Sequence, residues 1–530
     1  MPDNKRVIKI ESILGGQSAL THFATPGQYR SSLNINPALP IDDTISSTAY
    51  SVYGSGLLRP SPNKLISGTT ITSAPQWIIS SPKDGYVYVY DLSGSAYTIS
   101  TSDAVSALSD GGTLALSSGN GCEYYDNYIY FAKNTDIARY GPLNGSPAFT
   151  GTYWTGTLSK TALVNTTYPE TVDVNTLPNH VLHRHSDGRL YIADVVGNQG
   201  TIHYIQTTKT TVEGDTDNGS TYNKLQVGYG LWPTAMESYG SDLVIAFYEG
   251  SNAGSREQRA KLAFWDTTSA NVNKITWVEF PDPVIGALKN VNGVLYVSSG
   301  VNKQRGFRVS RFVGGYTIEE IFYIEDASMP LAGAVDGTAQ RLLFGSFTNV
   351  PFSSSAVYSY GLQKSALGKG IFNLMSPVIA DANSVVTALS LSRGGNGLGN
   401  DLPYVGVASA GGLGQIWAPT SGTYQVNSLF WSQMYRIGQP FKITKIRIPL
   451  VQAVAANMTI TPKIITDDAV GTAYTLTAIN NTNYSGASNI VYRLEGVTGK
   501  HNFFLELRWT GSVLLTVNLP ITIEYELIDD

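Results

Sequence analysis

The sequence predicts an all-β protein: a β-propeller of about seven blades with a C-terminal β-sandwich or jelly-roll-like domain. Only 14% of its 530 residues are charged, against roughly 25% in an average soluble protein. Fifty-three Gly and 32 Tyr help to fill the difference, which is typical of short strands joined by tight turns. No long segment repeats its apolar residues every 3.6 positions, so no major helix is expected.

The repeating unit is clearest in residues 180–208 (HVLHRHSDGRLYIADVVGNQGTIHYIQTT). Three antiparallel strands are predicted there, over residues 180–185, 189–195 and 201–208. Asp187-Gly188 marks the first turn, because Gly accepts the positive φ that a tight hairpin requires. In the middle strand Leu190, Ile192 and Asp194 should face one side and Tyr191 and Ala193 the other. A lone small sheet cannot bury both faces, so it needs similar neighbours.

The chain supplies those neighbours between residues 46 and 420. The second strand of each unit is centred on Val87, Ile129, Leu190, Leu243, Leu295, Leu343 or Tyr404. Spacings of roughly 40 to 60 residues suit propeller blades with variable insertions. Radial closure of such sheets leaves only short edges, which favours a propeller. Six or eight blades, or a series of β-sandwiches, remain open alternatives.

Both ends of the chain differ from this repeat. Residues 1–45 form a predicted N-terminal arm, in which Pro37 and Pro40 interrupt regular strand pairing. The arm either lies over the main domain or reaches a neighbouring subunit. Residues 421–530 alternate cleanly, for example Phe503, Leu505 and Leu507 against polar neighbours, and are predicted to form the β-sandwich.

The chain has a net charge of −5, which excludes a broad positively charged surface that would bind nucleic acid phosphates. A mildly acidic surface is compatible with a channel through which DNA slides. A single cysteine, Cys122, excludes an internal disulfide. No apolar signal segment and no run of about eighteen apolar residues is found, so folding in a cytoplasm without a membrane span is expected.

Candidate chemistry is sparse. Four of the six histidines fall at His180, His183, His185 and His203, and His183 and His185 share a strand face. Two histidines on one face can begin a metal site, but no third ligand has suitable spacing, so structural histidines are predicted. Neither a metal nor a cofactor is expected.

Catalytic motifs are also missing from the sequence. There is no Gly-x-Ser-x-Gly elbow, no Walker sequence and no Cys/His pairing. The glycine-rich run 394–399 follows no buried parallel strand and opens no helix. Asp194 and Asp266 are given no catalytic role. No catalytic residues are assigned, and the chain is predicted not to be an enzyme.

Arg447-Ile448-Pro449 is similar to the Arg-Ile-Pro motif of sialidases, which are also propellers. In sialidases that Arg precedes the first full blade, and their Ser-x-Asp-x-Gly-x-Thr-Trp boxes are absent here. A strand over residues 445–450 that ends at a proline explains the tripeptide.

Two regions near the ends resemble structural virion proteins of tailed bacteriophages. The N-terminal segments are residues 15–18 (GGQS) and 34–43 (NINPALPIDD). The C-terminal segments are residues 435–450 (YRIGQPFKITKIRIPL) and 499–507 (GKHNFFLEL). About a third of the chain is covered, and these are packing motifs.

The resemblance implies a tail component in the virion: a nozzle, tube-end or peripheral protein. Its expected partners are other tail proteins and further copies of itself in a ring or spike, with DNA passage or host attachment as its task. One alternative is an adhesin that stacks host glycans on aromatic side chains, with Trp417, Trp431 and Trp509 as candidates. A glycan-cleaving propeller is the other, and it would need carboxylates with perturbed pKa values converging on the channel.

Overall fold

A computed structural model gives the structure of the chain. It describes residues 5–11, 31–33, 57–58, 63–66, 71, 73–108, 121–133, 136–154, 180–196, 199–205, 225–249, 259–268, 272–300, 306–313, 316–325, 327–337, 341–348, 354–361, 371–375, 384–391, 403–408, 414–419, 428–467, 473–511, 513 and 515–528. The fold is all-β, as predicted, with many four-stranded sheets.

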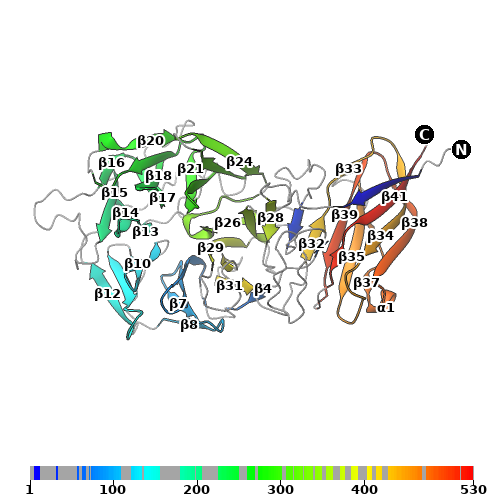
Figure 1. Ribbon diagram of the computed structural model, residues 1–530, viewed down its shortest axis with the longest axis horizontal. Coiled ribbons are helices and arrows are strands. Elements are labelled where there is room, and N and C mark those ends of the chain that lie inside the picture. Colours follow the sequence, from blue (N-terminus) through cyan, green and yellow to red (C-terminus); the bar gives the residue numbers. More distant parts are fainter. Residues whose placement is uncertain are drawn as a thin grey trace, which may run out of the picture. The chain divides into compact units, whose positions relative to one another are not determined.

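Seven four-stranded sheets form the blades (Figure 1). Blade 1 contains β5 (Pro75–Ser80), β6 (Val87–Asp91), β7 (Ala96–Ile99) and β8 (Val105–Ala107), and blade 2 contains β9 (Cys122–Tyr125), β10 (Tyr128–Ala132), β11 (Ile137–Gly141) and β12 (Ala148–Trp154). Blade 3 contains β13 (Leu182–Arg184), β14 (Leu190–Val196), β15 (Gln199–Ile205) and β16 (Leu225–Tyr229). Blade 4 contains β17 (Leu231–Tyr239), β18 (Asp242–Glu249), β19 (Lys261–Trp265) and β20 (Thr276–Glu279). Blade 5 contains β21 (Val284–Val291), β22 (Val294–Gly300), β23 (Phe307–Phe312) and β24 (Ile318–Ile324). Blade 6 contains β25 (Val335–Gly337), β26 (Arg341–Thr348), β27 (Ser354–Gly361) and β28 (Ile371–Met375). Blade 7 contains β29 (Val385–Leu391), β30 (Pro403–Ala408), β31 (Gly414–Pro419) and β4 (Asn63–Leu65).

The blades close into a ring. The first strand of each blade contacts the first strand of the next, and β29 of blade 7 contacts β5 of blade 1. Blade 7 takes its outermost strand, β4, from the segment that precedes blade 1. Next to β4, the Ile66 backbone N donates a 2.9 Å hydrogen bond to the Ile416 carbonyl. The first strands therefore surround the central axis of a seven-bladed propeller.

Each second strand is buried on both faces because a blade lies on either side of it. In β14, Leu190 and Ile192 pack with blade 2, while Tyr191 and Ala193 pack with blade 4. This division is the one predicted from the alternation of the sequence. Residues from blades 1 and 7 likewise share one core that includes Ile78 and Tyr404.

The structure corrects some predicted strands. In blade 6 a strand was expected over residues 331–335, but residues Ala332–Ala334 form a 3-10 turn and β25 begins at Val335. In blades 1, 2, 3, 6 and 7 the fourth strands, β8, β12, β16, β28 and β4, were not predicted. All five are the last strand in the order of their sheet, at the outer edge of a blade.

The C-terminal sandwich has two main sheets. One has the order β1 (Lys5–Ile10), β41 (Ile521–Leu527), β34 (Phe441–Pro449), β38 (Asn489–Gly499). The other has the order β2 (Ser31–Leu33), β32 (Ser428–Trp431), β39 (Asn502–Trp509), β35 (Thr459–Thr466), β36 (Ala473–Thr475), with β33 (Tyr435–Arg436) paired to β39 and β37 (Ile479–Asn480) paired to β35. A two-stranded pair of β3 (Leu57–Leu58) and β40 (Val517–Asn518) and a short helix α1 (Asn481–Tyr484) complete the described elements.

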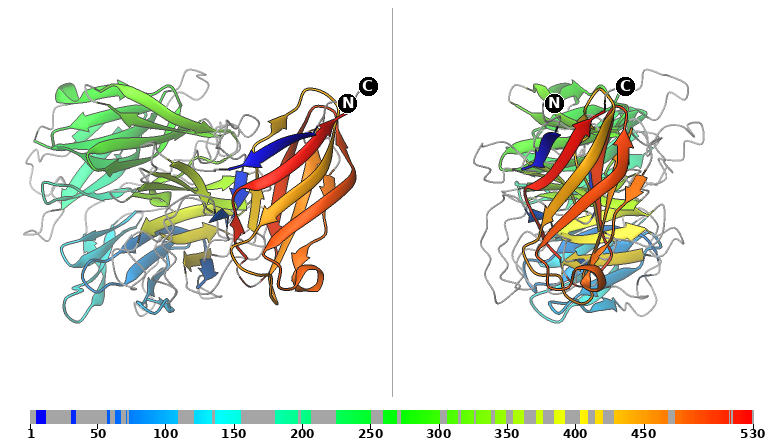
Figure 2. Two further views of the ribbon diagram at one scale, coloured as in Figure 1. Left: turned by 45° about the vertical axis from the view of Figure 1, so that its right-hand side comes forward. Right: turned by 90° about the vertical axis from the view of Figure 1, so that its right-hand side faces the viewer.

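The two sheets stack face to face (Figure 2). Their apolar residues share one core, in which Ile446, Ile523 and Leu505 are fully buried. Two strands from the predicted arm belong to these sheets, since β1 pairs with β41 and β2 with β32. By contacts the chain divides into two compact units, residues 65–348 with 381–418, and residues 1–64 with 349–380 and 419–530. Strand pairing nevertheless places β27 and β28 in the sheet of blade 6.

Candidate functional site: the inner belt of the propeller

Polar side chains on the first strands form a series of contacts that runs from blade 3 through blade 7 to blade 1, which we call the inner belt. Its members are Ser80, His183, Glu237, Ser238, Lys289, Asn290, Asp336 and Ser390. These residues lie at or within two positions of the end of strands that are otherwise largely apolar. Since the first strands run parallel to one another around the axis, residues near their ends meet at one level of the ring.

The first half of the inner belt joins blades 3, 4 and 5. The Nε2 atom of His183 lies 2.8 Å from Ser238 Oγ, and the Nδ1 atom of His185 lies 2.9 Å from the same oxygen. One hydroxyl can donate to one ring and accept from the other. The amide of Asn290 then donates a 2.7 Å hydrogen bond to the Ser238 carbonyl. His183 and His185 do share a face, as the alternation indicated, and both contact a serine.

The second half of the inner belt joins blades 5, 6, 7 and 1. Lys289 Nζ lies 2.8 Å from Asp336 Oδ1, and the Leu391 backbone N donates a 2.8 Å hydrogen bond to Asp336 Oδ2. The Ser390 and Ser80 hydroxyls, 3.1 Å apart, complete the link to blade 1. Every connection crosses from one blade to the next, so the inner belt joins six of the seven blades at their first strands.

The carboxyl groups of this region are of two kinds, one with a lowered pKa and one with a raised pKa. Burial would raise the pKa of Asp336, but the Lys289 ammonium lowers it below its ordinary value. Burial raises the pKa of Glu237, although Lys289 opposes the shift. The side chains of Glu237 and Asp336 are each 14% exposed and that of Lys289 is 24% exposed. The Lys289 ammonium therefore lowers the pKa of two largely buried carboxyl groups, but only that of Asp336 falls below its ordinary value.

Glu123 extends the charged region to blade 2. Burial raises the pKa of its carboxyl to about 7, with Glu237 adding to the rise and Lys289 reducing it. The carboxylate accepts a 2.9 Å hydrogen bond from the Tyr124 backbone N. At neutral pH the group is thus divided between its protonated and ionised forms, which is the property of a general acid or base.

Burial also lowers the pKa of His183 to about 3, with repulsion from Lys289 and His185 contributing. The imidazole is neutral at physiological pH. A neutral ring beside Glu237, whose Oε1 is 3.8 Å from His183 Nε2, acts as a hydrogen-bonding group rather than as a cation.

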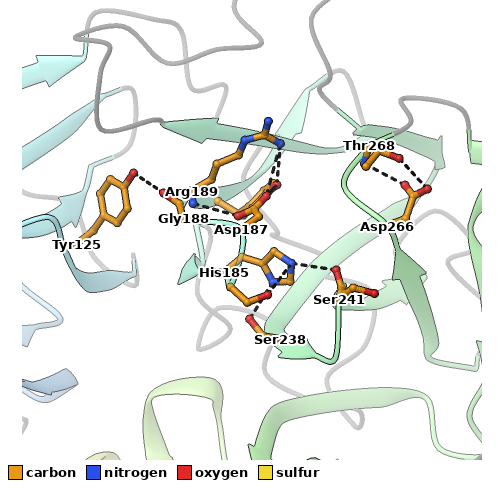
Figure 3. Close-up of polar contacts among 11 residues, drawn as sticks. Tyr125, His185, Asp187, Gly188, Arg189, Ser238, Ser241, Asp266 and Thr268 are labelled. Carbon is orange, nitrogen blue, oxygen red and sulfur yellow. Dashed lines mark hydrogen bonds and ion pairs between the residues drawn. The ribbon is translucent and has the colours of Figure 1, made fainter.

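The hairpin turns of blades 2, 3 and 4 meet at this end of the propeller (Figure 3). The Tyr125 hydroxyl donates a 2.7 Å hydrogen bond to the Gly188 carbonyl, which links blades 2 and 3. His185 Nε2 lies 3.2 Å from the Ser241 carbonyl, which links blades 3 and 4. Asp266 caps its own turn, where it accepts from the Thr268 backbone N at 3.0 Å.

A second histidine cluster lies inside blade 3. Asp194 Oδ1 is 3.5 Å from His180 Nδ1, and Asp194 Oδ2 is 3.6 Å from His203 Nε2. The Asp194 side chain is fully buried, and those of His180 and His203 are 1% and 6% exposed. Substrate has no access to groups so deeply buried, so this cluster is structural. In the part of the chain that is described, no group of three or more His, Cys, Asp or Glu is arranged to hold a metal ion.

The three tryptophans considered for glycan stacking differ in placement. Trp509 is 2% exposed in the sandwich core and donates to the Leu515 carbonyl at 2.7 Å. Trp431 is half-buried and donates to Glu506 Oε2 at 2.8 Å. The side chain of Trp417 lies outside the described residues.

Glu123, Glu237, Lys289 and Asp336 were not singled out from the sequence. Each is the single charged residue of its strand, and the sequence comparison aligned the second strands of the blades. Aligning the first strands would have shown a charge recurring near the end of CEYY, LWPTAMESY, VIGALKNV and VDG.

Seven closed blades define the larger part of this chain as a seven-bladed β-propeller, and the two stacked sheets define the rest as a β-sandwich. No model of a known protein family matches the sequence, and no curated protein matches it. Among the described residues, no helix is long and apolar enough to span a membrane.

Solved structures similar to the chain include propeller domains. The Pan2 WD40 domain of Neurospora crassa shares 7% identity over 68% of this chain and 95% of its own, with a TM-score of 0.39. The Cps50 (Swd1) propeller of Myceliophteria thermophila shares 9% over 68% of this chain and 100% of its own, with a TM-score of 0.41. Extracellular domains 1-2 of Drosophila Semaphorin 1a share 10% over 68% and 88%, with a TM-score of 0.40. Such distant likeness carries no argument about function.

Proposed function

We propose that the chain is a non-enzymatic structural component of a bacteriophage tail, acting in the virion by assembly with other tail proteins and with copies of itself. DNA passage or host attachment is the corresponding task. The proposal begins from the resemblance of residues 435–450 and 499–507 to phage virion proteins.

One observation carries the proposal further: these two segments pack against each other. Tyr435 pairs with Phe503 across β33 and β39, and the Phe441 and Phe503 rings lie 5.5 Å apart in the core. The Ile437 backbone N donates a 2.7 Å hydrogen bond to the His501 carbonyl. Gly499 is required there, since a Cβ on it would lie 2.4 Å from the Phe441 ring. The shared motif thus specifies one corner of the sandwich, as expected if the resemblance reflects a common domain.

The experiment is localisation of the chain in particles. An antibody raised against the purified protein, with a gold-labelled secondary antibody, is applied to tailed particles from cells that carry the gene and viewed by negative-stain electron microscopy. Label confined to tails is expected, and preincubation with the purified chain should remove it. Particles that lack the chain, by labelling and by mass spectrometry, would overturn the proposal.

Binding or cleavage of a host glycan is a second candidate, favoured by the carboxyl groups of the first strands. Glu123, Glu237 and Asp336 come from three blades, and their pKa values are shifted in opposite directions. Separated pKa values among neighbouring acids are typical of acid–base pairs in glycosidases. In this candidate Glu123 is the proton donor and Asp336 the ionised carboxylate.

Glycan binding is measured on an array with the wild type and with Glu123→Gln and Asp336→Asn, and hydrolysis by release of reducing ends. This candidate predicts a glycan that the wild type binds or cleaves and that both variants handle at least tenfold less well. Absence of any bound or cleaved glycan, or equal behaviour of the variants, contradicts it.

A further inference from the structure

The sandwich presents one sheet face with an unusual charge. The side of the β1-β41-β34-β38 sheet opposite to the core carries three rows of paired residues, which we call the outer sheet face (Figure 2, right). The rows are Lys5, Glu526, Lys442, Thr498; Val7, Glu524, Lys445, Arg493; and Lys9, Thr522, Arg447, Val491. Their neighbours along the strands, such as Ile523 and Ile446, point into the core.

Half of these twelve positions are Lys or Arg, although the whole chain has only 35 such residues in 530. Glu524 and Glu526 are the only carboxylates in the rows, and Lys445 Nζ lies 2.7 Å from Glu524 Oε1. The rows therefore carry four more positive than negative charges. Counting exposed Glu495 of β38 and exposed Glu11, whose Oε1 lies 4.0 Å from Lys9 Nζ, leaves two. Because the chain as a whole carries −5, everything outside the rows carries −9.

Protection of sheet edges does not account for this charge. Lysine on an edge strand discourages unwanted strand pairing, and that would explain Lys5 and Lys9 on β1. Lys442, Lys445 and Arg447, however, lie on β34, which is paired on both sides by β41 and β38. Cations on an interior strand protect no edge. They make the face itself positive.

Apolar side chains lie among the charges. Val7 is 54% exposed and Val491 is 40% exposed, at opposite margins of the face. The row with Lys9 and Arg447 has no carboxylate, and Arg447 Nε donates a 2.9 Å hydrogen bond to Asn489 Oδ1, which holds its side chain across the sheet. The face therefore combines a net positive charge with exposed apolar side chains at its two margins.

We propose that the outer sheet face is the surface through which the chain binds a second copy of itself, at an acidic surface of that copy. Charge complementarity supports this occupant, since the chain outside the rows carries nine more negative than positive charges. This inference rests on the proposed function in that it names the self-assembly surface of the tail component.

The sign of the charge also restricts the symmetry. Two outer sheet faces cannot meet each other, because like charges would be opposed. The contact is therefore between two different surfaces, head to tail. Contacts of that kind close into rings or continue as filaments, whereas a two-fold dimer requires the same patch on both partners. Assemblies of three or more chains follow from this geometry.

Nucleic acid is a poorer occupant of the face. Glu524 and Glu526 lie along β41 between the basic residues of β1 and β34. Phosphates crossing the sheet would approach these carboxylates, and they would gain little from Val7 and Val491. An acidic protein surface can instead place its own polar and apolar groups against this mixed pattern.

The test is the mass of the full chain in solution by light scattering, at low and high salt. Assemblies of three or more chains are expected at about 50 mM salt and smaller ones at about 500 mM, because salt screens exposed charges. The variant Lys442→Glu/Arg447→Glu/Arg493→Glu should weaken association at least tenfold. A milder variant, Lys442→Gln/Arg447→Gln/Arg493→Gln, should weaken it less. Circular dichroism and thermal unfolding show whether each variant is folded.

A matched control applies the same charge change elsewhere, at exposed Lys83, Lys274 and Lys500, each changed to Glu. The control should assemble at least as well as the wild type. A monomer at all salt concentrations, a two-fold dimer, or folded variants that assemble normally would each overturn the proposal. So would binding of a short DNA duplex that the face variant loses while its mass is unchanged. Failure of tail labelling would leave these results standing, so the two proposals are tested separately.

Discussion

The Tyr191 hydroxyl donates a 2.6 Å hydrogen bond to Oδ2 of Asp187, the residue that begins the hairpin turn of blade 3. The other oxygen of Asp187 accepts from the Arg189 backbone N at 3.0 Å. Blade 1 repeats the arrangement, with Tyr88 and Asp84 in the same positions and the same 2.6 Å distance. The short sequence Asp-Gly-x-x-Tyr is therefore a turn in which one carboxylate fixes both the backbone and the following strand.

Loss of this bond should destabilise the propeller. Tyr191→Phe is expected to lower the free energy of unfolding by about 1–2 kcal/mol, since the acceptor is charged and one of its donors is removed. Urea unfolding followed by fluorescence measures the change. Tyr86→Phe, in the matching turn of blade 1 but 39% exposed, is the control and should change little. Equal stability of Tyr191→Phe and the wild type would contradict this role for the turn.

The sequence predicted the blades well because their second strands are buried on both sides. Their apolar runs, bounded by turns such as Asp187-Gly188, stand out from the sequence whatever surrounds them. Outer strands such as β8 and β16 did not, because they are short and partly exposed. The repeated units indicated that the sheets close radially into a propeller. The sequence of β4, however, does not indicate that this strand pairs with β31 to complete blade 7.

The corner of the sandwich gives a second prediction. Gly499→Ala should cost about 1–3 kcal/mol, because the new methyl group would lie 2.4 Å from the ring of fully buried Phe441. Thermal and urea unfolding measure it. Gly151→Ala is the matched control, since nothing lies within 4 Å of its Cβ position. The control should be neutral or slightly stabilising, because alanine restricts the unfolded chain. A Gly499→Ala protein as stable as the control would show that the ring moves aside freely.

Glu123 should make stability fall as pH rises. Its carboxyl has a pKa of about 7 in the folded protein against an ordinary 4.5, so the folded state binds more protons than the unfolded state between those values. The stabilisation is present below pH 4.5 and is lost as pH rises through 7. Glu123→Gln removes this dependence. The variant should gain about 1–3 kcal/mol relative to the wild type between pH 5 and pH 8.

Unfolding by urea at several pH values measures the effect of Glu123→Gln. Tyr124 keeps its hydrogen bond in this variant, since the Gln oxygen accepts from the same backbone N. A wild type and a variant with parallel stability profiles would contradict the raised pKa.

Lys289 should be essential to the charged part of the inner belt. Lys289→Met leaves Asp336 and Glu237 without their cation, and a cost of about 2–4 kcal/mol is expected for a pair this little exposed. Adding Asp336→Asn should recover part of the loss, because the unpaired charge is removed. Asp336 has a lowered pKa, so its contribution is present above pH 3.8 and is lost as pH falls through its folded pKa. The difference between wild type and Lys289→Met should therefore shrink in acid.

The four proteins of this double-mutant cycle are compared by urea unfolding at pH 7 and at pH 3. Additive single-site effects would show that Lys289 and Asp336 contribute independently.

The inner belt could not be predicted from the sequence for a physical reason. Lys289 and Asp336 are separated by a complete blade, and so are His183 and Ser238. Only the radial closure of the blades brings each pair together. The residue pattern within one blade predicts its own strands, but it does not predict which residues of the next blade they contact. His183 and His185 were noticed because they lie two positions apart in the sequence, yet their shared partner, Ser238, comes from another blade.

Strand order also constrains how the chain can fold during synthesis. Blade 7 is complete only when β4, at residues 63–65, meets β31, at residues 414–419, and β1 pairs with β41 from Lys5 to Glu526. These pairings join segments from opposite ends of the sequence, so the chain loses the entropy of closing long loops before the new strand contacts stabilise it. Early blades can collapse on the ribosome with an open edge, but the ring cannot close until residues 414–419 have emerged, and the sandwich cannot close until residues 521–527 have emerged. Folding is thus slow at its last step, and a chaperone that covers exposed edges should raise the yield of native protein.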